Sequence, residues 1–457
     1  MLDKKHIEYF KKILPKEFVF SEPGDCWAYG YDNSKLHVLP ECVLFAENKS
    51  QIQNIVIYCN KNQIPITTRG RGTGNTGGSV PSKDSIVLSL EKMQKIIKID
   101  IANRIAIVEP GVINKYLQDS LAEHNFFWGP DPSSLEYSTI GGNIANNSAG
   151  PRAIKYGTPR DNILGLEFIS GNGEIHKTGV KTSKGVVGLD LTRLFVGSEG
   201  ILGILTEATL KITPKSNCVK TIEVTFDNIE AASNTIIALM TQSLTPYKLE
   251  FIDEQSIKLI NSIKKNHYDE NTKSAILLEL DSEKELIQVI TEKIINVIKK
   301  NKYRNINIAE NKKEIKKLWE ARKSLSPALR EIGGYKINED IAVPITNLTI
   351  LLKTLEDISN KYNIKIVNFG HAGNGNIHVN LLFDSDKERN SDNARECLGE
   401  IFDLVIELDG TISGEHGIGI VKKDFIKKEI NENTLSLMKN IKQQFDPNNI
   451  LNPDKSI

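Results

Sequence analysis

The chain has 457 residues, of which 39% are hydrophobic and 25% charged, as in ordinary soluble proteins of two or three domains. Lysine plus arginine and aspartate plus glutamate number 58 each, so the formal net charge is zero, which argues against a nucleic-acid-binding protein that depends on phosphate neutralisation. No stretch approaches the ~20 apolar residues of a membrane span, and the charged N-terminus has no apolar core of a secretory signal.

Cysteine usage points to a reducing compartment. The five cysteines are scattered, odd in number and without a CxxC pair. They predict reduced thiols in the cytoplasm, argue against a disulfide scaffold and exclude an internal iron–sulfur cluster held by cysteines.

Glycine marks the organisation of the chain. Of 32 glycines, 22 precede residue 204, none lies between 204 and 332, and ten lie in 333–419. In the first part, short apolar runs between glycine turns predict strands at 64–70, 85–90, 104–111 and 163–173. Helices are expected at 112–125 and at 48–62, where one face carries Ile52, Ile55, Val56 and Cys59.

From residue 219 strands and helices alternate. Strands are predicted at 221–226, 247–252 and 275–280, and helices at 228–241, 253–263 and 283–300. The last helix places Leu286, Ile290, Ile294 and Val297 at helical spacing. This order predicts an α+β domain whose sheet is covered on one face.

The loop 69–79, RGRGTGNTGGS, formally contains GxGxxG, but a strand follows it where a Rossmann fingerprint requires a helix. Its five glycines free consecutive N–H groups to converge on an anion, and Arg69 and Arg71 add positive charge. A flexible hairpin tip is the alternative for this loop alone.

Two further runs, GPDPSSLEYSTIGGNIANNSAG (129–150) and LFVGSEGILGILTEATLKI (194–212), follow it. Together the three runs resemble the FAD-binding domain of the vanillyl-alcohol-oxidase/PCMH-type flavoproteins, over residues 36–215. The resemblance implies a pyrophosphate site formed by Pro65, Arg69, Gly70, Gly72, Thr73, Gly74, Asn75 and Thr76. It implies ribityl and isoalloxazine contacts from Pro130, Asp131, Thr139, Gly141, Gly142, Asn143, Asn146, Ser148 and Gly150, and further contacts from Gly200 and Ile201. The first two runs contain no histidine or cysteine, so we expect FAD to be bound non-covalently.

The runs FGHAGNGNIHVN (369–380) and DGTISGEHGIG (409–419) carry the candidate chemistry. A glycine turn between His371 and His378 can bring the two imidazoles together, and alternation places His378 and Asn380 on one strand face. With the carboxylate of Glu415, two histidines form a set that binds catalytic metals.

These runs resemble the GHxGDGNxH and GEHG motifs of the FAD-linked oxidase C-terminal domain. That domain occurs in the GlcD subunit of glycolate oxidase, in D-lactate dehydrogenases and in D-2-hydroxyglutarate dehydrogenases, and FDPNNILNP (445–453), with Asn452 as a further cofactor contact, matches its closing motif. The resemblance implies zinc or manganese on His371, His378 and Glu415, with His416 as the catalytic base. Asn374 replaces the usual aspartate, so we expect weaker metal retention than in relatives.

The fold expected from these resemblances is α+β: a two-subdomain PCMH-type FAD-binding domain, a cap domain with a ferredoxin-like sheet, and a helical C-terminal return. The predicted divisions are an N-terminal helical segment 1–35, the FAD-binding domain 36–215, the cap 216–410 and a closing segment 411–457.

The function implied is oxidation of D-lactate or glycolate, in which Arg322 binds the substrate carboxylate and His416 takes the hydroxyl proton. The rival substrate D-2-hydroxyglutarate needs a second cation, and relatives that use it carry a lysine shortly before the position of Pro344. Here Asn338 stands near that position and Lys336 lies two residues further away, which favours a monoacid. A rival of another class is a non-catalytic flavin-carrying subunit of an electron-transfer complex.

No nicotinamide site is visible, so electrons should leave to a quinone or to a separate iron–sulfur subunit. The expected location is the cytoplasm, with peripheral association at the inner membrane through the acceptor as one option. Oligomeric state, a homodimer among the options, is left open by the sequence.

Overall fold

The computed structural model describes residues 2–264, 267–332 and 334–457. The chain forms two compact units, each described here by itself. Unit 1 comprises Met1–Gly150, Gly157–Lys215 and Glu415–Ile457, and unit 2 comprises Pro151–Tyr156 and Ser216–Gly414. Where the sequence suggested divisions after 35, 215 and 410, the structure passes between units after 150, 156, 215 and 414.

The first sheet of unit 1 has the strand order β1-β2-β4-β3. Strands β2, β3 and β4 are parallel, and β1 joins β2 in an antiparallel pair. The strands are β1 (Val19–Phe20), β2 (Val43–Phe45), β3 (Ile66–Arg69) and β4 (Ile86–Ser89), and the accompanying helices are α1 (Lys4–Ile13), α2 (Pro23–Cys26) and α3 (Lys49–Asn62). The predicted N-terminal helical segment therefore also contributes a strand to this sheet.

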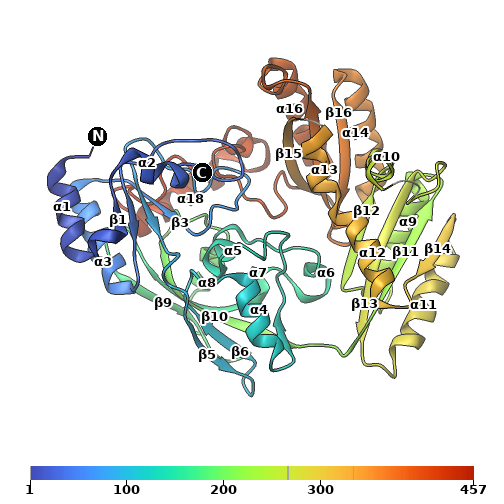
Figure 1. Ribbon diagram of the computed structural model, residues 1–457, viewed down its shortest axis with the longest axis horizontal. Helices are drawn as coiled ribbons and strands as arrows, with labels where there is room; N and C mark the ends of the chain where they lie inside the picture. Colours follow the sequence, from blue (N-terminus) through green and yellow to red (C-terminus); the bar gives the residue numbers. More distant parts are fainter. Residues whose placement is uncertain (1, 265–266, 333) are drawn as a thin grey trace. The chain divides into compact units, whose positions relative to one another are not determined.

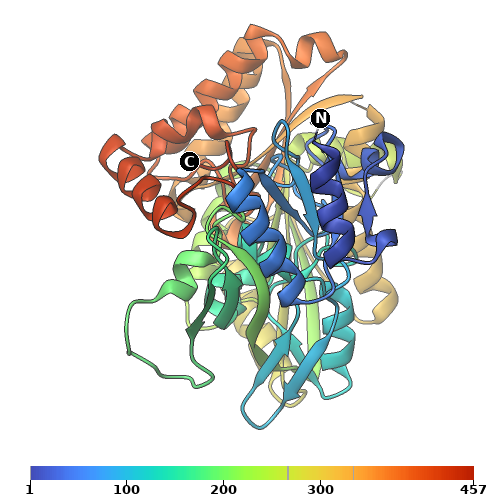
Figure 2. The same cartoon turned by 90° about the vertical axis from the view of Figure 1, so that its left-hand side faces the viewer.

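Helix α3 confirms the predicted amphipathic helix. Ile52, Ile55, Val56 and Cys59 are all fully buried in one apolar core with residues of β2, β3 and β4. Asn48 caps the helix by accepting a hydrogen bond from the Gln51 N–H. Figure 2 shows α1 and α3, in blue, side by side against this sheet.

The second sheet of unit 1 has the order β5-β6-β10-β8-β9, and β7 pairs with β10. Two sheets in one unit correspond to the two subdomains expected of a PCMH-type FAD-binding domain. The strands are β5 (Ile96–Asp100), β6 (Ile105–Val108), β7 (Phe126–Trp128), β8 (Ile163–Ile169), β9 (Ile175–Gly179) and β10 (Ile204–Pro214). The helices of this region are α4 (Asn114–Ala122), α5 (Ile140–Asn146), α7 (Pro159–Asn162) and α8 (Leu191–Phe195).

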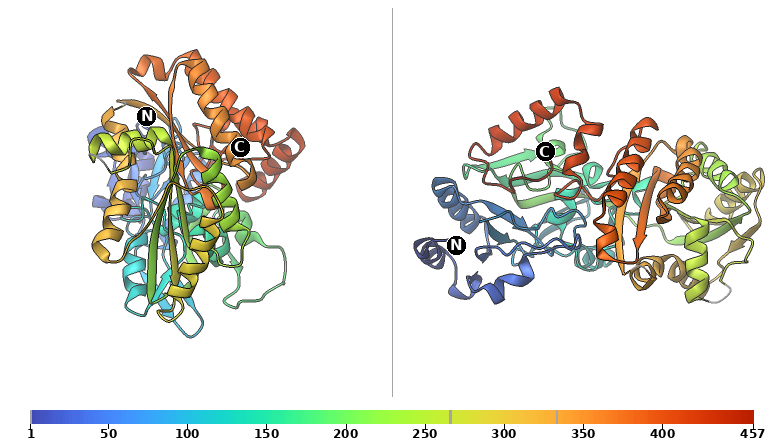
Figure 3. Two further views of the ribbon diagram at one scale, coloured as in Figure 1. Left: turned by 90° about the vertical axis from the view of Figure 1, so that its right-hand side faces the viewer. Right: turned by 90° about the horizontal axis from the view of Figure 1, so that it is seen from above.

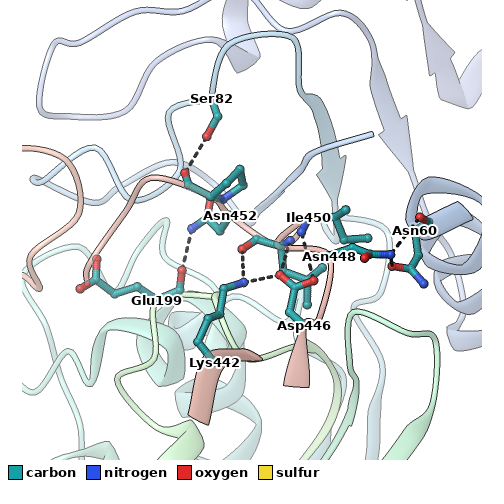
Figure 4. A network of polar contacts seen from close by, with 10 residues as sticks. Asn60, Ser82, Glu199, Lys442, Asp446, Asn448, Ile450 and Asn452 are labelled. Carbon is teal, nitrogen blue, oxygen red and sulfur yellow. Dashed lines mark hydrogen bonds and ion pairs between the residues drawn. The ribbon is translucent and has the colours of Figure 1, made fainter. Parts of the chain in front are cut away.

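The end of the chain returns to unit 1 through α17 (Ile426–Glu429) and α18 (Glu432–Phe445). After α18, the carboxylate of Asp446 accepts hydrogen bonds from the Ile450 N–H (3.0 Å) and the Leu451 N–H (2.8 Å), which folds the chain into a tight turn. The Asn452 amide then donates to the Glu199 carbonyl (2.7 Å), as Figure 4 shows. The closing motif is thus fixed to the glycine turn at residues 197–200.

Unit 2 is built on a seven-stranded antiparallel sheet of order β14-β11-β13-β12-β16-β17-β15. Its first four strands have the 4-1-3-2 order of a ferredoxin-like sheet, which confirms the expected cap fold. The strands are β11 (Cys218–Phe226), β12 (Lys248–Ile252), β13 (Ser274–Ser282), β14 (Asn305–Ile308), β15 (Tyr335–Ala342), β16 (Lys365–Gly370) and β17 (Asn376–Phe383).

Helices cover both faces of this sheet, so the expectation of one covered face was wrong (Figure 3, left). One face packs on α10, α12 and α13 through a core that includes Ile252, Ala275, Val367 and Phe369. The other face is covered by α9, α11 and α14, and α16 packs on α14. The helices of unit 2 are α6 (Ala153–Tyr156), α9 (Ile229–Met240), α10 (Glu254–Ile263), α11 (Ile287–Lys299), α12 (Lys312–Lys323), α13 (Leu325–Ile332), α14 (Leu348–Tyr362), α15 (Asp386–Arg389) and α16 (Asp392–Glu407).

The buried face of α11 differs from the predicted one. Ile287, Thr291, Ile294 and Ile298 are buried, whereas Leu286 is 55% exposed. Both sets have helical spacing, and the direction from which the sheet approaches the helix decides which is covered. None of the helices in the described ranges is long and apolar enough to span a bilayer.

Candidate active site

The side chain of Arg69 packs against the glycine loop that follows β3. This side chain is buried, its Nη1 donates to the Tyr31 carbonyl (2.7 Å), and the guanidinium lies 5.7 Å from the Tyr29 ring centroid. Gly72 has φ +63°, and a Cβ there would collide with the guanidinium. Arg69 therefore shapes the loop, while the more exposed Arg71 pairs with Glu91 (3.2 Å).

The run 139–150 forms helix α5, which begins beside this loop. Thr139 caps the helix by accepting a hydrogen bond from the Gly142 N–H (3.1 Å). A Cβ on Gly70 would collide with the Thr139 hydroxyl, so glycine allows the two segments to touch. Asn143 is buried and accepts from the Asn114 amide (2.9 Å), which holds the helix in place.

Three glycines in unit 1 lie close to polar groups of other segments. A Cβ on Gly74 would lie 3.7 Å from Asp32, one on Gly78 would lie 3.6 Å from Glu199, and one on Gly200 would lie 3.7 Å from the Asn452 amide. The glycine loop, the turn at 197–200 and the closing motif therefore lie together in one region of unit 1. We call this region the glycine cradle.

The other predicted cofactor residues lie on the same segments. Pro65 precedes β3, and its carbonyl accepts from the Ile86 N–H. A Cβ on Gly150 would collide with the Asp131 carbonyl, and one on Gly141 would lie 2.8 Å from Pro110, so backbone pairs approach closely at both points. Thr73, Asn75, Thr76, Pro130, Asn146, Ser148 and Ile201 complete the set within unit 1.

The residues of the glycine cradle fit FAD. Glycines let backbone N–H groups approach a pyrophosphate closely, and the side-chain amides of Asn75 and Asn146 add polar groups. Residues 65–80 and 129–150 contain no histidine or cysteine that could bond the flavin covalently.

Glu415 and His416 begin the return of the chain to unit 1, and each is held by one hydrogen-bonding group, the Glu415 carboxylate and the His416 carbonyl. The Glu415 carboxylate accepts from the Gly150 N–H (2.7 Å) and the Ala149 N–H (3.2 Å). The His416 carbonyl accepts from the Thr76 hydroxyl (3.2 Å). These contacts fix the two residues against the predicted flavin-binding segments.

The next residues are held by Glu199. Its buried carboxylate accepts from the Ile418 N–H (2.8 Å) and the Gly419 N–H (2.7 Å). Burial raises the pKa of Glu199, although these two N–H groups oppose the shift.

In unit 2 the predicted turn brings His371 and His378 together. A 3-10 turn at Ala372–Asn374 reverses the chain between β16 and β17, and Gly375 completes it with φ +70°. The two rings are perpendicular with centroids 5.3 Å apart, and ligand atoms of the pair lie within 4.8 Å. Asn374 is exposed at the turn.

His371 is oriented by Glu250, which the sequence analysis did not identify. The Glu250 carboxylate lies 2.5 Å from His371 Nδ1, and its other oxygen accepts from Arg322 Nη2 (2.7 Å) and Nε (2.9 Å). Glu250 is 1% exposed. Burial would raise its pKa, but the charges and hydrogen bonds of His371 and Arg322 outweigh burial and hold the pKa at about 2.

This contact bears on the tautomer of His371. When the imidazole is neutral, a carboxylate on Nδ1 favours the tautomer in which Nε2 is the acceptor nitrogen, the arrangement found where histidine binds a metal. The donor set of His371 and His378 therefore fits a divalent metal. The sequence did contain an indication of this role for Glu250, because a charged residue interrupts the otherwise apolar strand YKLEFI.

Asp340 is an acidic neighbour of His378 and, like Glu250, was not identified from the sequence. The two residues are paired across β15 and β17, with ligand atoms within 4.8 Å. Asp340 is fully buried and accepts from the Asn376 amide (2.8 Å) and the Gly414 N–H (3.1 Å). On the same face, Asn380 Oδ1 is a buried acceptor with no hydrogen-bond partner among the described residues.

Arg322 lies beside this histidine pair, over the ring of Phe369 (4.4 Å). Its side chain is 11% exposed. The structure thus brings together His371, His378 and Arg322 in unit 2, whereas Glu415 and His416 are described in unit 1, one peptide bond beyond Gly414.

Replacing Glu250 with glutamine should destabilise unit 2 by about 3 kcal/mol, because Arg322 and His371 would lose the carboxylate that compensates their burial. Urea unfolding followed by circular dichroism measures the change. The control is Glu310→Gln, which removes an exposed pair with Lys220 and should cost under ~1 kcal/mol. Equal effects of the two substitutions would contradict the structural role of Glu250.

Two family models match the chain. The model described as FAD linked oxidases, C-terminal domain, matches residues 215–456, and the model of an FAD binding domain matches residues 40–179. The chain is 38% identical over 442 residues to glycolate oxidase subunit GlcD of Bacillus subtilis, covering 96% of this chain and 94% of that protein. It is 33% identical over 445 residues to the D-lactate dehydrogenase of Archaeoglobus fulgidus, covering 95% and 96%.

Solved structures share the fold at lower identity. p-Cresol methylhydroxylase aligns with a TM-score of 0.80 at 19% identity, covering 99% of this chain and 96% of that one. Alkyldihydroxyacetonephosphate synthase aligns with a TM-score of 0.78 at 17% identity, covering 100% and 85%. These likenesses support the PCMH-type architecture.

Proposed function

The chain belongs to the FAD-linked oxidases, and from that premise we propose that it oxidises D-lactate or glycolate to the corresponding 2-oxo acid. It is an FAD-dependent oxidoreductase acting on the CH–OH group of 2-hydroxy acids. The observation that carries the finer proposal is the turn 371–378, where Glu250 orients one of two adjacent imidazoles beside a buried arginine.

We assign His371, His378 and Glu415 as the residues that hold a zinc or manganese ion. When bound, FAD supplies a hydride acceptor and the metal supplies a Lewis acid that makes the substrate hydroxyl more acidic. Glu250 favours the His371 tautomer whose acceptor nitrogen is Nε2. The backbone N–H groups of Ala149 and Gly150 orient the Glu415 carboxylate.

His416 is assigned as the base that takes the hydroxyl proton, because its backbone is fixed at the flavin-binding segments and a neutral imidazole accepts a proton near neutral pH. Arg322 is assigned to the substrate carboxylate, since a guanidinium binds carboxylates in bidentate geometry. Its contact with Glu250 holds the guanidinium in place for that task.

A small monoacid is favoured over D-2-hydroxyglutarate by the strand opposite Asn380. Asn338 is paired with Asn380, and Lys336, two residues further along the same strand face, is paired with Leu382. The position nearer to His378 therefore carries an amide, and the lysine lies further away.

Anaerobic flavin bleaching tests the function. The purified holoenzyme should lose its yellow colour with D-lactate or glycolate, and not with L-lactate or D-malate. Bleaching by D-2-hydroxyglutarate instead would change the substrate assigned. No bleaching by any of these acids would favour the rival of a flavin-carrying subunit without its own substrate.

FAD should be released by acid. Because residues 65–80 and 129–150 lack histidine and cysteine, precipitation with trichloroacetic acid should leave the yellow colour in the supernatant. The absorbance of supernatant and redissolved pellet gives the ratio. Colour that stays with the pellet would show a covalent bond to a residue outside these segments.

We further propose that electrons leave the flavin to an external acceptor, a quinone or a separate iron–sulfur subunit. The five cysteines contain no CxxC, so this chain offers no cysteine-held cluster of its own. Rates with a soluble quinone analogue and with an added iron–sulfur partner would separate the two, and light scattering would show whether the chain is a dimer.

A further inference from the structure

A loop of unit 1 carries the three most exposed large hydrophobic side chains among the described residues. Val186 is 97% exposed, Val187 100% and Leu189 88%, and the next such side chain, Tyr137, is 71% exposed. They lie in the segment 180–190 between β9 and α8, which we call the valine loop. Every residue from Gly179 to Asp190 is exposed. In Figure 2 this loop, in green, extends away from the strands of its own sheet.

The base of the valine loop is firmly attached. The Thr192 hydroxyl donates to the Thr178 hydroxyl (2.8 Å), and the Val180 N–H donates to the Leu164 carbonyl (2.9 Å). Asp190 caps α8 by accepting from the Arg193 N–H (3.0 Å). The apolar tip is therefore presented on a fixed support and is not part of an unattached tail.

The charge of the loop is positive. Between Gly179 and Leu189 the charged residues are Lys181 and Lys184, both exposed. Asp190, the last residue of the loop, caps α8 and lies 3.7 Å from Arg193, which leaves the loop a net positive charge. A partner that fits this loop must accept a few aliphatic side chains and compensate positive charge.

We propose that the valine loop docks the protein on the surface of an anionic lipid bilayer. Aliphatic side chains flanked by lysines suit the boundary between acyl chains and anionic headgroups. Three aliphatic side chains fall far short of the roughly 20–30 residues a side of a standard protein interface. A second copy pairing through the same loop would bring like charges together, which disfavours self-association here.

Docking through this loop would place unit 1 at the bilayer. Helix α8 follows the loop directly and leads into the turn 197–200, whose Gly200 belongs to the glycine cradle. The docking surface and the predicted cofactor site are therefore parts of the same unit. The inference concerns binding to lipid and is independent of which hydroxy acid is oxidised.

Vesicle sedimentation tests the proposal with the FAD-loaded protein. It should pellet with phosphatidylcholine vesicles that contain phosphatidylglycerol, and far less with phosphatidylcholine alone. Val186→Ser with Val187→Ser, and separately Lys181→Gln with Lys184→Gln, should each weaken the apparent affinity roughly tenfold or more. High salt should reverse the lysine-dependent part.

Matched controls use exposed residues of unit 2. Ile350→Ser on α14, where the side chain is 53% exposed, and Lys299→Gln with Lys300→Gln on α11 should bind vesicles like the wild type. The loop variants should retain the FAD spectrum and flavin reduction by substrate, which separates failure of docking from failure of the proposed function.

Several results would overturn the proposal. The first two are wild-type binding by the loop variants and failure of the wild-type protein to bind anionic vesicles. A third is a dimer, or a complex with an iron–sulfur protein, that only the Val186→Ser, Val187→Ser variant disrupts, together with no binding to vesicles. The loop would then be a protein interface. Quenching of a Val187→Trp variant by brominated lipid gives a second readout, and its absence on bound vesicles would also count against insertion.

Discussion

Replacing His378 with alanine should abolish turnover while the bound FAD keeps its absorbance. His378 lies in unit 2 on β17, whereas the glycine cradle is built from segments of unit 1. Removing one of two adjacent imidazoles breaks the proposed metal set, and loss of Lewis-acid assistance worth several kcal/mol corresponds to about a thousandfold or more in rate. Stopped-flow flavin reduction with D-lactate or glycolate measures the loss, and elemental analysis of the same sample reports the metal.

His124→Ala is the matched control, because His124 is an exposed histidine at the end of α4 and should leave rate and metal unchanged. Dialysis of the wild type against a chelator should reproduce the His378→Ala rate, with activity restored by zinc or manganese. Asn374 replaces the aspartate of related motifs, so this inactivation should be readily reached. Unchanged turnover with unchanged metal content in His378→Ala would refute the assignment.

Replacing His416 with asparagine should lower the rate of flavin reduction by roughly 10²–10⁴-fold, the usual worth of a general base. The substitution should leave the local backbone in place, because Thr76 binds the His416 carbonyl and the neighbouring Glu415 is held by Gly150. FAD and metal should therefore both remain bound.

Two further outcomes separate this role from a structural one. Near-wild-type reduction would show that His416 is not the base. Loss of metal together with activity would instead identify His416 as a ligand.

Local chemistry made much of the site predictable. The turn 371–378 depends on nearby glycines, and Gly375 adopts the positive φ that the reversal requires, so the meeting of two histidines follows from a short stretch of chain. The buried face of α3 was likewise predictable, because Ile52, Ile55, Val56 and Cys59 form one continuous apolar face at helical spacing.

Contacts between distant segments were not predictable. Glu250 and His371 are far apart in sequence, and only the pairing of β12 with β16 sets the carboxylate beside the imidazole. Arg69 was expected to add charge at the phosphate loop, and the structure places its guanidinium beneath that loop on the Tyr31 carbonyl. Neither contact can be recognised from sequence periodicity, because each depends on the position of a second segment that is distant in the sequence.

The sequence by itself indicated the class of protein and its α+β fold through the resemblance of its motifs to those of the FAD-linked oxidases. The glycine turn that brings His371 and His378 together and the apolar stripe of α3 were predictable from local spacing. Only the tertiary structure decided that both faces of the large sheet are covered, that residues 151–156 join unit 2, and that Ile287 and Ile298 rather than Leu286 are buried on α11. Strand order and helix placement depend on the sum of many weak contacts across the chain. The sequence of one segment alone does not show which other segment packs on it.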